Sequence, residues 1–318
     1  MAVRYRSLWI TSPWSSLDHP RDTTLRLMTE AQELGWDNLW CDPSTICISQ
    51  GRLSVGAAPL VQVIDQSIDG FVFGENRTYT LPCLDNVMVR MDPPIDIGYL
   101  QTLQVLELGR SLASQKCVAF TNPLEALMAS NSKLEPLRVR GAEPPTVVAR
   151  EWDCLRKFGV LHQRTIVKPL NSCNSDGIQR LDWSTSSGVE HARYVIELLS
   201  NRFVVSVLLQ KDLAPPQADE VRLWMLDGDV LAAAAKTFQG DFRKMSGLRA
   251  AALETSHVTT IAVLRQHLRA RRIRLAAVDI IGSAIIDVNF ASPGLLVELE
   301  ELTDTNLARD VIQALAPA

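Results

Sequence analysis

The chain has 318 residues, 47% hydrophobic and 21% charged, so it can bury a large core and is expected to form two or three globular units. Its net charge of -4 argues against nucleic acid as the main partner, and no run of 18 apolar residues predicts a membrane span. The first residues lack the apolar stretch and cleavage site of a secretory signal, so a cytoplasmic protein is expected.

The first part of the chain alternates strand and helix patterns. RSLWITSP predicts a buried strand leading into a loop, and residues 22–35 carry apolar side chains at helical spacing before a glycine. Two apolar runs, DGFVF and NVMVRMDPPID, then precede a second helical pattern over residues 98–115. This alternation predicts an α/β sheet over residues 1–119.

Two further units are predicted beyond that sheet. Residues 120–203 combine a strand pattern, RTIVKPL, with the polar loop NSCNSDG, as in a small α+β unit. Residues 204–318 contain several strand patterns and two helix patterns, and their LDGDV segment favours a hairpin turn because Asp-Gly tolerates positive φ. The predicted division is therefore 1–119, 120–203 and 204–318.

The segment VDIIGSAIIDVNFASPG, residues 278–294, places polar side chains in an apolar hairpin pattern. A three-residue loop would set Asp279 opposite Asp287, with Asn289 on the same face, whereas a two-residue loop would put the aspartates on opposite faces. Two adjacent carboxylates in apolar surroundings favour a cation between them, and all-oxygen ligands favour Mg²⁺ or Mn²⁺. The alternative is that both aspartates are exposed strand residues.

A second segment, RQHLRARRIR over residues 265–274, is locally very basic. Arginines at helical spacing beside an apolar stripe are typical of a solvated helix face. A phosphate-contacting surface or a subunit surface is the alternative interpretation.

Several motifs occur in the order found in ATP-grasp ligases, and the chain most closely resembles prokaryotic glutathione synthetases. RMDPPID is similar to that family's Arg-x-Asp-Pro-Pro-x-Asp segment, NPLEALMASNSKL to its proline followed ten residues later by lysine, and IVKPL to its nucleotide-lysine strand. LLQKDL resembles the hinge, VRLWMLDGDV the Arg-led hairpin, and VDIIGSAIIDVNFASP the final Asp, acid, Asn and Ser-Pro series. Ordered matches over some two hundred residues are specific, although each alone is weak.

The resemblance implies a mixed α/β ATP-grasp fold with an N-terminal α/β pre-ATP-grasp domain, a small central lid domain and a C-terminal ATP-binding domain. It implies an ADP-forming ligase that uses ATP and Mg²⁺ or Mn²⁺ and forms an amide through an acyl phosphate. The acid and amine would be γ-glutamylcysteine and glycine, or another small-molecule or peptide pair in peptide or specialised-metabolite synthesis. No nucleic acid or membrane partner is implied, and relatives of this type often form dimers or tetramers.

The resemblance also implies roles for individual residues. Lys133 and Lys168 would contact the phosphates or the adenine-proximal side of ATP, and Gln210 would read the base from the hinge. Arg222, near the γ-phosphate, and Arg90 are the predicted catalytic residues. Two residue sets complete the predicted site: Asp279, Asp287 and Asn289 for the metal ions and nucleotide, and Arg90, Lys236, Arg243 and Ser292 for the acid and the amine.

Some of these assignments have structural alternatives. Lys133 could be an exposed helix lysine, Arg222 could stack on Trp224, and Ser292-Pro293 could be only a turn. A dinucleotide-binding dehydrogenase is discarded because no GxGxxG follows the first strand.

The sequence also departs from the family pattern. Asp287 stands where glutamate is usual, the phosphate loop NSCNSDGIQR has only Gly177, and the substrate lid has only Gly240 and Gly247. Lys236 replaces an arginine, and lysine cannot make the same two-pronged contact with a carboxylate. These departures bear mainly on substrate choice, and they motivate a second hypothesis, a non-catalytic nucleotide-binding or scaffold protein with this fold.

Overall fold

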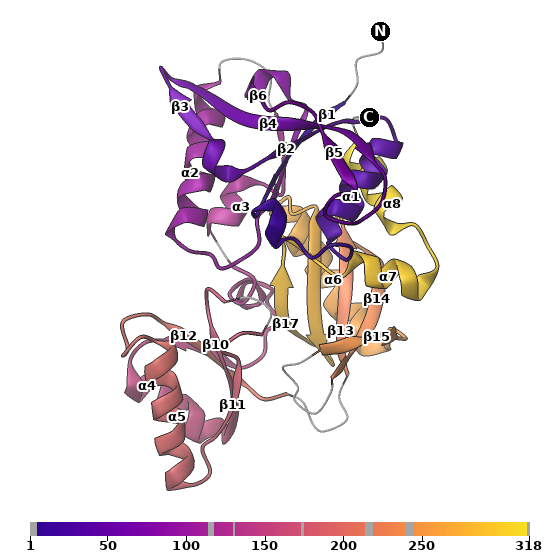
Figure 1. The fold of residues 1–318 in the computed structure, drawn as a ribbon. Helices are drawn as coiled ribbons and strands as arrows, with labels where there is room; N and C mark the ends of the chain where they lie inside the picture. The colour runs from indigo at the N-terminus through magenta and orange to yellow at the C-terminus, as the bar shows by residue number, and fades with distance from the viewer. Residues whose placement is uncertain are drawn as a thin grey trace.

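A computed structural model of the chain describes residues 5–113, 118–129, 131–172, 175–213, 219–238 and 245–316. Helices and strands are mixed throughout these ranges, which confirms the predicted α/β class (Figure 1). None of the helices in them is long and apolar enough to cross a bilayer. The predicted lid residues Gly240 and Arg243 lie outside the described residues.

The N-terminal part of the described chain forms an eight-stranded sheet with the order β3-β4-β2-β1-β7-β8, and β5 and β6 pair with β4. Its strands are β1 (Arg6–Thr11), β2 (Asp37–Cys41), β3 (Cys47–Ser49), β4 (Arg52–Val63), β5 (Phe71–Phe73), β6 (Arg77–Thr80), β7 (Asn86–Arg90) and β8 (Ala119–Thr121). Strands β2, β1, β7 and β8 run parallel, as expected where helices connect them.

Helices α1 (Thr23–Glu33) and α2 (Ile97–Leu112) accompany this sheet, followed by α3 (Leu124–Ala129). Asp22 caps α1 by accepting hydrogen bonds from two backbone N–H groups, and Gly35, just after the helix, has a φ of +81°. The helix predicted over residues 22–35 is therefore confirmed with its glycine stop, and the structure adds the Asp22 cap.

The central unit is an antiparallel four-stranded sheet in the described ranges, with the order β11-β10-β12-β9. Its strands are β9 (Thr146–Ala149), β10 (Arg164–Pro169), β11 (Gln179–Asp182) and β12 (Val207–Lys211), and its helices are α4 (Trp152–His162) and α5 (Ser186–Leu199). Strand β12 follows residue 203, the predicted end of the central part, yet it pairs with β10 and β9.

The C-terminal part places five described strands in the order β15-β14-β13-β16-β17. They are β13 (Glu220–Leu226), β14 (Asp229–Phe238), β15 (Met245–Ala250), β16 (Leu275–Ile281) and β17 (Ala284–Asn289), with helices α6 (Thr255–Ala270), α7 (Leu296–Thr303) and α8 (Leu307–Leu315). Asp227 and Gly228 have φ angles of 51° and 85° and join β13 to β14, which confirms the predicted hairpin turn.

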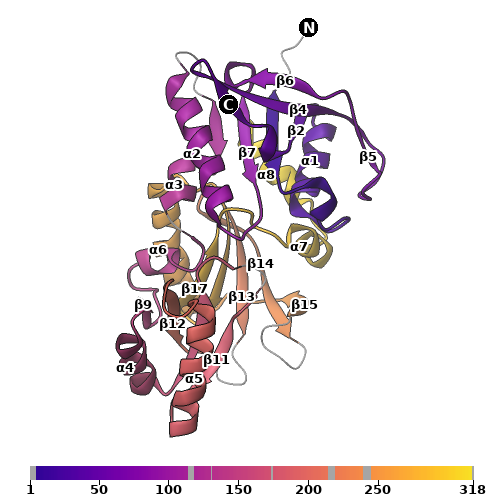
Figure 2. The same ribbon diagram turned by 60° about the vertical axis from the view of Figure 1, so that its left-hand side comes forward.

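The hydrophobic cores show how the three sheets are coupled. Two buried clusters each combine side chains of the N-terminal and C-terminal sheets, for example Leu8 with Leu223 and Trp9 with Trp224. The central unit has a cluster of its own around Leu155 and Trp183. Figure 2 accordingly shows the central unit projecting from a joined N- and C-terminal body.

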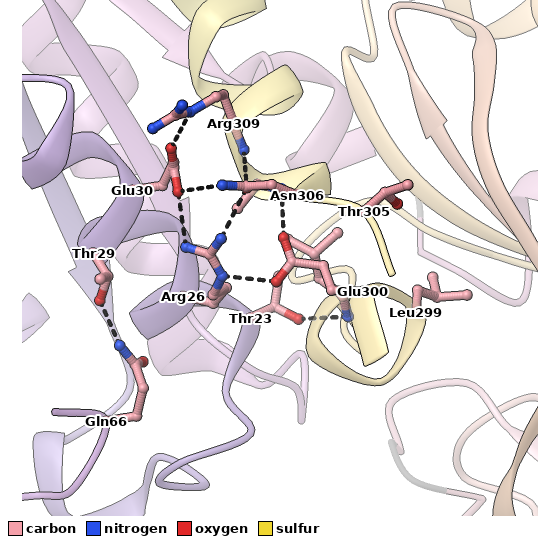
Figure 3. A network of polar contacts seen from close by, with 12 residues as sticks. Thr23, Arg26, Thr29, Glu30, Gln66, Leu299, Glu300, Thr305, Asn306 and Arg309 are labelled. Atoms are coloured by element: carbon pink, nitrogen blue, oxygen red, sulfur yellow. Dashed lines mark hydrogen bonds and ion pairs between the residues drawn. The ribbon is translucent and has the colours of Figure 1, made fainter. Parts of the chain in front are cut away.

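A buried carboxylate fastens the C-terminal helices to α1 (Figure 3). Glu30 is 1% exposed and accepts hydrogen bonds from Arg26, Asn306 and Arg309 at 2.7–3.1 Å. Arg26 also donates to Glu300 of α7 at 2.7 Å. Because two of these partners are arginines, the buried charge of Glu30 is compensated where α1 and α8 meet.

Candidate active site

The β16–β17 hairpin brings its three polar residues onto one face by an unexpected route. Ile281 pairs with Ala284, so the loop has only the two residues Gly282 and Ser283. A bulge then shifts the register, because Ile280 pairs with Ile285 but Asp279 pairs with Asp287, which leaves Ile286 as the extra residue. The expectation that a two-residue loop would separate the aspartates is therefore wrong, because the bulge restores the pairing.

Asp279 is 3% exposed and has two cationic partners. Arg222, directly opposite on β13, donates from Nε and Nη2 to its two carboxylate oxygens at 2.8 and 2.7 Å. Lys236 Nζ donates to Oδ2 at 2.6 Å and also contacts Glu220. Burial alone would raise the pKa of Asp279, but the charges of Arg222 and Lys236 outweigh it and lower that pKa strongly.

The arginine in this network is also shifted. Burial alone would lower the pKa of Arg222, but the adjacent charge of Asp279 reverses that effect and raises it. The polar groups of both side chains bind other partners, because the Arg222 guanidinium pairs with Asp279 and Trp224 Nε1 donates to Gly294 O at 3.1 Å. The sequence interpretation, which considered a divalent ion alone, did not foresee that the chain supplies two counter-ions to Asp279.

On this face, the side-chain oxygens of Asp287 and Asn289 accept fewer hydrogen bonds from the described residues than those of Asp279 do. Among the described residues, none donates a hydrogen bond to the buried Oδ1 of Asp287. Within the described ranges, Asn289 Oδ1 accepts one long bond of 3.4 Å from Ser292 N, while its Nδ2 donates to Ser292 O at 3.2 Å. A buried carboxylate oxygen without a donor fits a Mg²⁺ ligand, since Mg²⁺ prefers oxygen.

The ligand set would be mixed. In the ranges that the structure covers, no three His, Cys, Asp or Glu side chains cluster so that they could hold a metal ion. A site on this hairpin face would combine the carboxylates of Asp279 and Asp287 with the Asn289 amide oxygen. Such a set leaves coordination positions for phosphate oxygens or water, as Mg²⁺ sites usually do.

The two predicted nucleotide lysines approach the same hairpin. Lys168 on β10 is 7% exposed and donates from Nζ to Ile286 O, the bulged residue, at 3.0 Å. Burial lowers the pKa of Lys168, and the charge of Asp287 offsets part of that change. Lys133 is 5% exposed and contacts Ser172 O, so the alternative of an exposed helix lysine is wrong.

Backbone contacts explain how Lys133 reaches the site. Ser132 O accepts a hydrogen bond from Val288 N at 2.9 Å, and Ala142 O accepts one from Ile285 N at 2.8 Å. The segment that includes Lys133 therefore covers the outer edge of β17. Gln210 is buried on β12, where it pairs in register with Ile166, two residues before Lys168.

Arg90 ends β7 close to the Ser292–Pro293 segment. Its guanidinium is 3% exposed and donates to Thr24 Oγ1 at 3.1 Å and to Pro293 O at 3.0 Å, while Nη1 has no acceptor among the described residues. Burial lowers the pKa of Arg90 despite the nearby charges of Asp22 and Asp92. Burial raises the pKa of Asp92, and the nearby Ser292 hydroxyl and Arg90 charge offset part of that change.

The basic segment at the end of α6 lies away from this face. A cavity of about 500 Å³ is lined there by residues that include Arg110, Arg269, Arg272 and Arg274. Arg274 pairs with Asp227, and Arg265 and Arg269 both pair with Asp229. These ion pairs agree better with a solvated structural face than with a phosphate surface.

Sequence reasoning missed Glu220 and Thr24. Glu220 lies two residues before Arg222 on β13, so the two-residue period of a strand could have placed both on one face. Thr24 touches Arg90 across 66 residues of sequence, and no local pattern announces that contact.

Comparison with known families gives two matches that follow each other along the chain. Residues 6–126 match the prokaryotic glutathione synthetase N-terminal domain, and residues 132–304 match the prokaryotic glutathione synthetase ATP-grasp domain. The glutathione synthetase of Parasynechococcus marenigrum is 29% identical, with 98% of each chain covered. That of Synechocystis sp. is 25% identical, with 96% of this chain and 97% of the relative covered.

Solved structures with a similar fold include other ligases. D-cycloserine synthetase DcsG gives a TM-score of 0.65 at 18% identity, covering 97% of this chain and 98% of that one. ATP-grasp ligase PsnB complexed with minimal precursor gives 0.63 at 16% identity, covering 98% of each chain. Macrocyclase MdnB from Microcystis aeruginosa MRC gives 0.63 at 13% identity, covering 99% of this chain and 100% of that one. These TM-scores support the ATP-grasp fold, and identities this low support nothing beyond the fold.

Proposed function

Because this chain belongs to the prokaryotic glutathione synthetase family and is an ADP-forming carboxylate–amine ligase that uses ATP and Mg²⁺, we propose that it joins its acid and amine on the face formed by the β16–β17 hairpin, β13 and β10. The reaction proceeds through an acyl phosphate that the amine then converts to an amide. The observation that carries this assignment is the buried Asp287 oxygen without a donor, beside Asn289 and opposite Asp279.

Residues of the hairpin hold the metal ions in this proposal. Asp287, Asn289 and Asp279 present oxygens on one face, which suits Mg²⁺. When bound, Mg²⁺ neutralises phosphate charge. Lys168 and Lys133 add fixed positive charge next to that face, since Lys168 Nζ touches β17 itself. Gln210, one strand away from Lys168, reads the base.

Two arginines and their neighbours handle the reacting groups. Arg222 is held rigidly by both oxygens of Asp279, so its guanidinium is preorganised toward the γ-phosphate. Nη1 of Arg90 has no acceptor among the described residues, and we assign it to the carboxylate of the acid substrate. Ser292, Lys236 and Arg243 complete the sites for the acid and the amine in this proposal.

The substrate pair is either γ-glutamylcysteine with glycine or another acid and amine. Lys236 in place of the family's arginine and the glycine-poor loops favour the second choice, because they alter the groups that contact substrate. Among proteins of similar fold, some are ligases with peptide precursors and one is a D-cycloserine synthetase. We therefore propose small-molecule or peptide substrates for this chain.

The test is ADP release across a panel of acids and amines, with mass detection of the product. We expect ADP and phosphate only when a matching acid and amine are both present. A panel without ADP release, together with tight ADP binding by calorimetry, would instead support the non-catalytic scaffold.

The cytoplasmic location, the dimer or tetramer and the division at residues 119 and 203 remain predictions.

A further inference from the structure

We propose that Lys236 is the resident counter-ion of Asp279, and that it exchanges with the metal ion by moving its charge onto Glu220. This inference rests on the proposed function, since it requires Asp279 to bind a divalent cation. It adds Glu220 as a positioning residue for Lys236.

The starting point is one ammonium group that contacts two carboxylates. Lys236 Nζ lies 2.6 Å from Asp279 Oδ2 and also contacts Glu220 Oε1. The three side chains are 11%, 4% and 21% exposed, in the order Lys236, Asp279 and Glu220. Water therefore screens these contacts only weakly, and the charges must balance within the chain.

Asp279 is fully engaged by cations in this arrangement. Its Oδ2 accepts hydrogen bonds from both Arg222 Nη2 and Lys236 Nζ, while Oδ1 accepts one from Arg222 Nε. A divalent ion on Oδ2 would take the place of one of these donors and would repel both. Metal and side-chain cation therefore compete for the same oxygen.

Lys236 is the partner that can leave. Arg222 sits directly opposite Asp279 and is bound through two parallel N–H groups, so releasing it would break two bonds at once. Lys236 makes a single bond to Asp279 from a flexible stem and already contacts Glu220. It can release Asp279 without becoming an unpaired buried charge.

This exchange predicts opposite effects for the two partners. Without Lys236, Asp279 Oδ2 keeps only its bond from Arg222 among these two cations, so the metal ion meets less competition and binds more tightly. Without the charge on Glu220, Lys236 has no second carboxylate to balance its own charge and holds Asp279 more firmly, so the metal binds more weakly. If the ion pair between Lys236 and Asp279 were merely structural, both variants would bind the metal ion more weakly.

The experiment measures Mn²⁺ alone binding to the full-length protein by electron paramagnetic resonance, without nucleotide. We expect Lys236→Met to lower the Kd for Mn²⁺ about tenfold and Glu220→Gln to raise it about tenfold, as for hydrogen bonds between charged groups. Lys236→Arg keeps a competing cation and should not tighten binding. Asp287→Asn identifies the signal, because it should remove binding at this site.

An adjacent ion pair supplies matched charge controls. Arg249 on β15 lies opposite Ala235 and pairs with Asp219, the residue before Glu220, and both side chains are about half exposed. Arg249→Gln and Asp219→Asn make the same charge changes without touching Asp279, and should change the Kd by less than about twofold. If the Arg249 and Asp219 variants shifted the Kd for Mn²⁺ as much as the Lys236 and Glu220 variants, only long-range charge would be acting. That result would overturn the exchange.

Other outcomes are also decisive. Unchanged or weaker Mn²⁺ binding in Lys236→Met overturns the proposal, and Lys236→Gln repeats the test if the methionine variant does not fold. A wild-type protein that binds no Mn²⁺ at this face overturns both the exchange and the metal site. A wild-type protein that binds Mn²⁺ and shows the opposite shifts, but releases no ADP, supports the exchange and contradicts the proposed function.

Discussion

Asp287 keeps a buried carboxylate oxygen without a donor among the described residues, which is unfavourable for folding. We expect Asp287→Asn to lower turnover at least about 100-fold, as the loss of a preorganised electrostatic contact can do. Stability should be unchanged or higher, because a buried charged oxygen that lacks a hydrogen-bond donor is replaced by a neutral amide. Steady-state ADP release and thermal unfolding measure the two effects.

The exposed Asp310 provides a matched control for that change, since it lies on α8 far along the chain from the hairpin. Asp310→Asn should alter neither measurement. Full activity in Asp287→Asn would show that the metal site does not lie on the hairpin face.

Arg90 allows a second prediction at this scale. Lysine keeps the charge but cannot contact Thr24 and Pro293 and still direct a third N–H group at a substrate. We expect Arg90→Lys to raise the KM for the acid about tenfold, with a smaller change in kcat. The exposed Arg52 serves as control, and an equal fall in kcat with unchanged KM would contradict the proposed role of Arg90.

Among single residues, predictability depended on separation along the chain. Spacing placed Asp279, Asp287 and Asn289 together because they belong to one hairpin. The partners of Asp279 lie 57 and 43 residues away on other strands, so only the sheet order brings them in. The sequence interpretation assigned Arg222 to the phosphate and Lys236 to the substrate. It did not foresee that both pair with the carboxylate of Asp279.

At the scale of elements, the hairpin shows how a bulge changes what a loop length implies. The sequence left two loop lengths open and linked the shared face to a three-residue loop, whereas a two-residue loop and a bulge at Ile286 give the same pairing. The pair Ile285-Ile286 breaks the alternation of polar and apolar residues, and both side chains are buried. That break was the available signal for the bulge.

The contact between α1 and the C-terminal helices gives a pH-dependent prediction. Burial would raise the pKa of Glu30, but hydrogen bonds from Asn306, Arg309 and Arg26 lower it below the ordinary value of 4.5. Its contribution to stability is therefore present above pH 4.5 and is lost as the pH falls through the folded-state pKa.

We accordingly expect Glu30→Gln to lower the free energy of unfolding by about 1–3 kcal/mol at pH 7, less than for a fully buried pair because Arg309 is half exposed. The difference from wild type should shrink at acidic pH. Denaturant unfolding at pH 7 and pH 4 measures it, with the exposed Glu33→Gln as control. A difference that grows on acidification would contradict the sign of the pKa shift.

For the whole molecule, alternation of strands and helices predicted the α/β class and the N-terminal sheet. It did not place β12 in the central sheet, because strand pairing across 38 or more residues leaves no local pattern. Nor did it predict that the first and last sheets share two hydrophobic clusters. Such packing depends on the final arrangement of elements.

The shared clusters lead to a prediction about local stability. Because the central unit has its own core, it can open without disrupting the clusters that join the other two sheets. We expect amide hydrogens of β10 and β12 to exchange faster than those of β13 and β16, as measured by hydrogen–deuterium exchange with mass spectrometry. Adding ADP and Mg²⁺ should slow exchange chiefly in β10 and β12, since Lys168 and Gln210 belong to those strands. Equal exchange in both units would mean that they unfold as one, and protection confined to β13 and β16 would place the nucleotide away from the central unit.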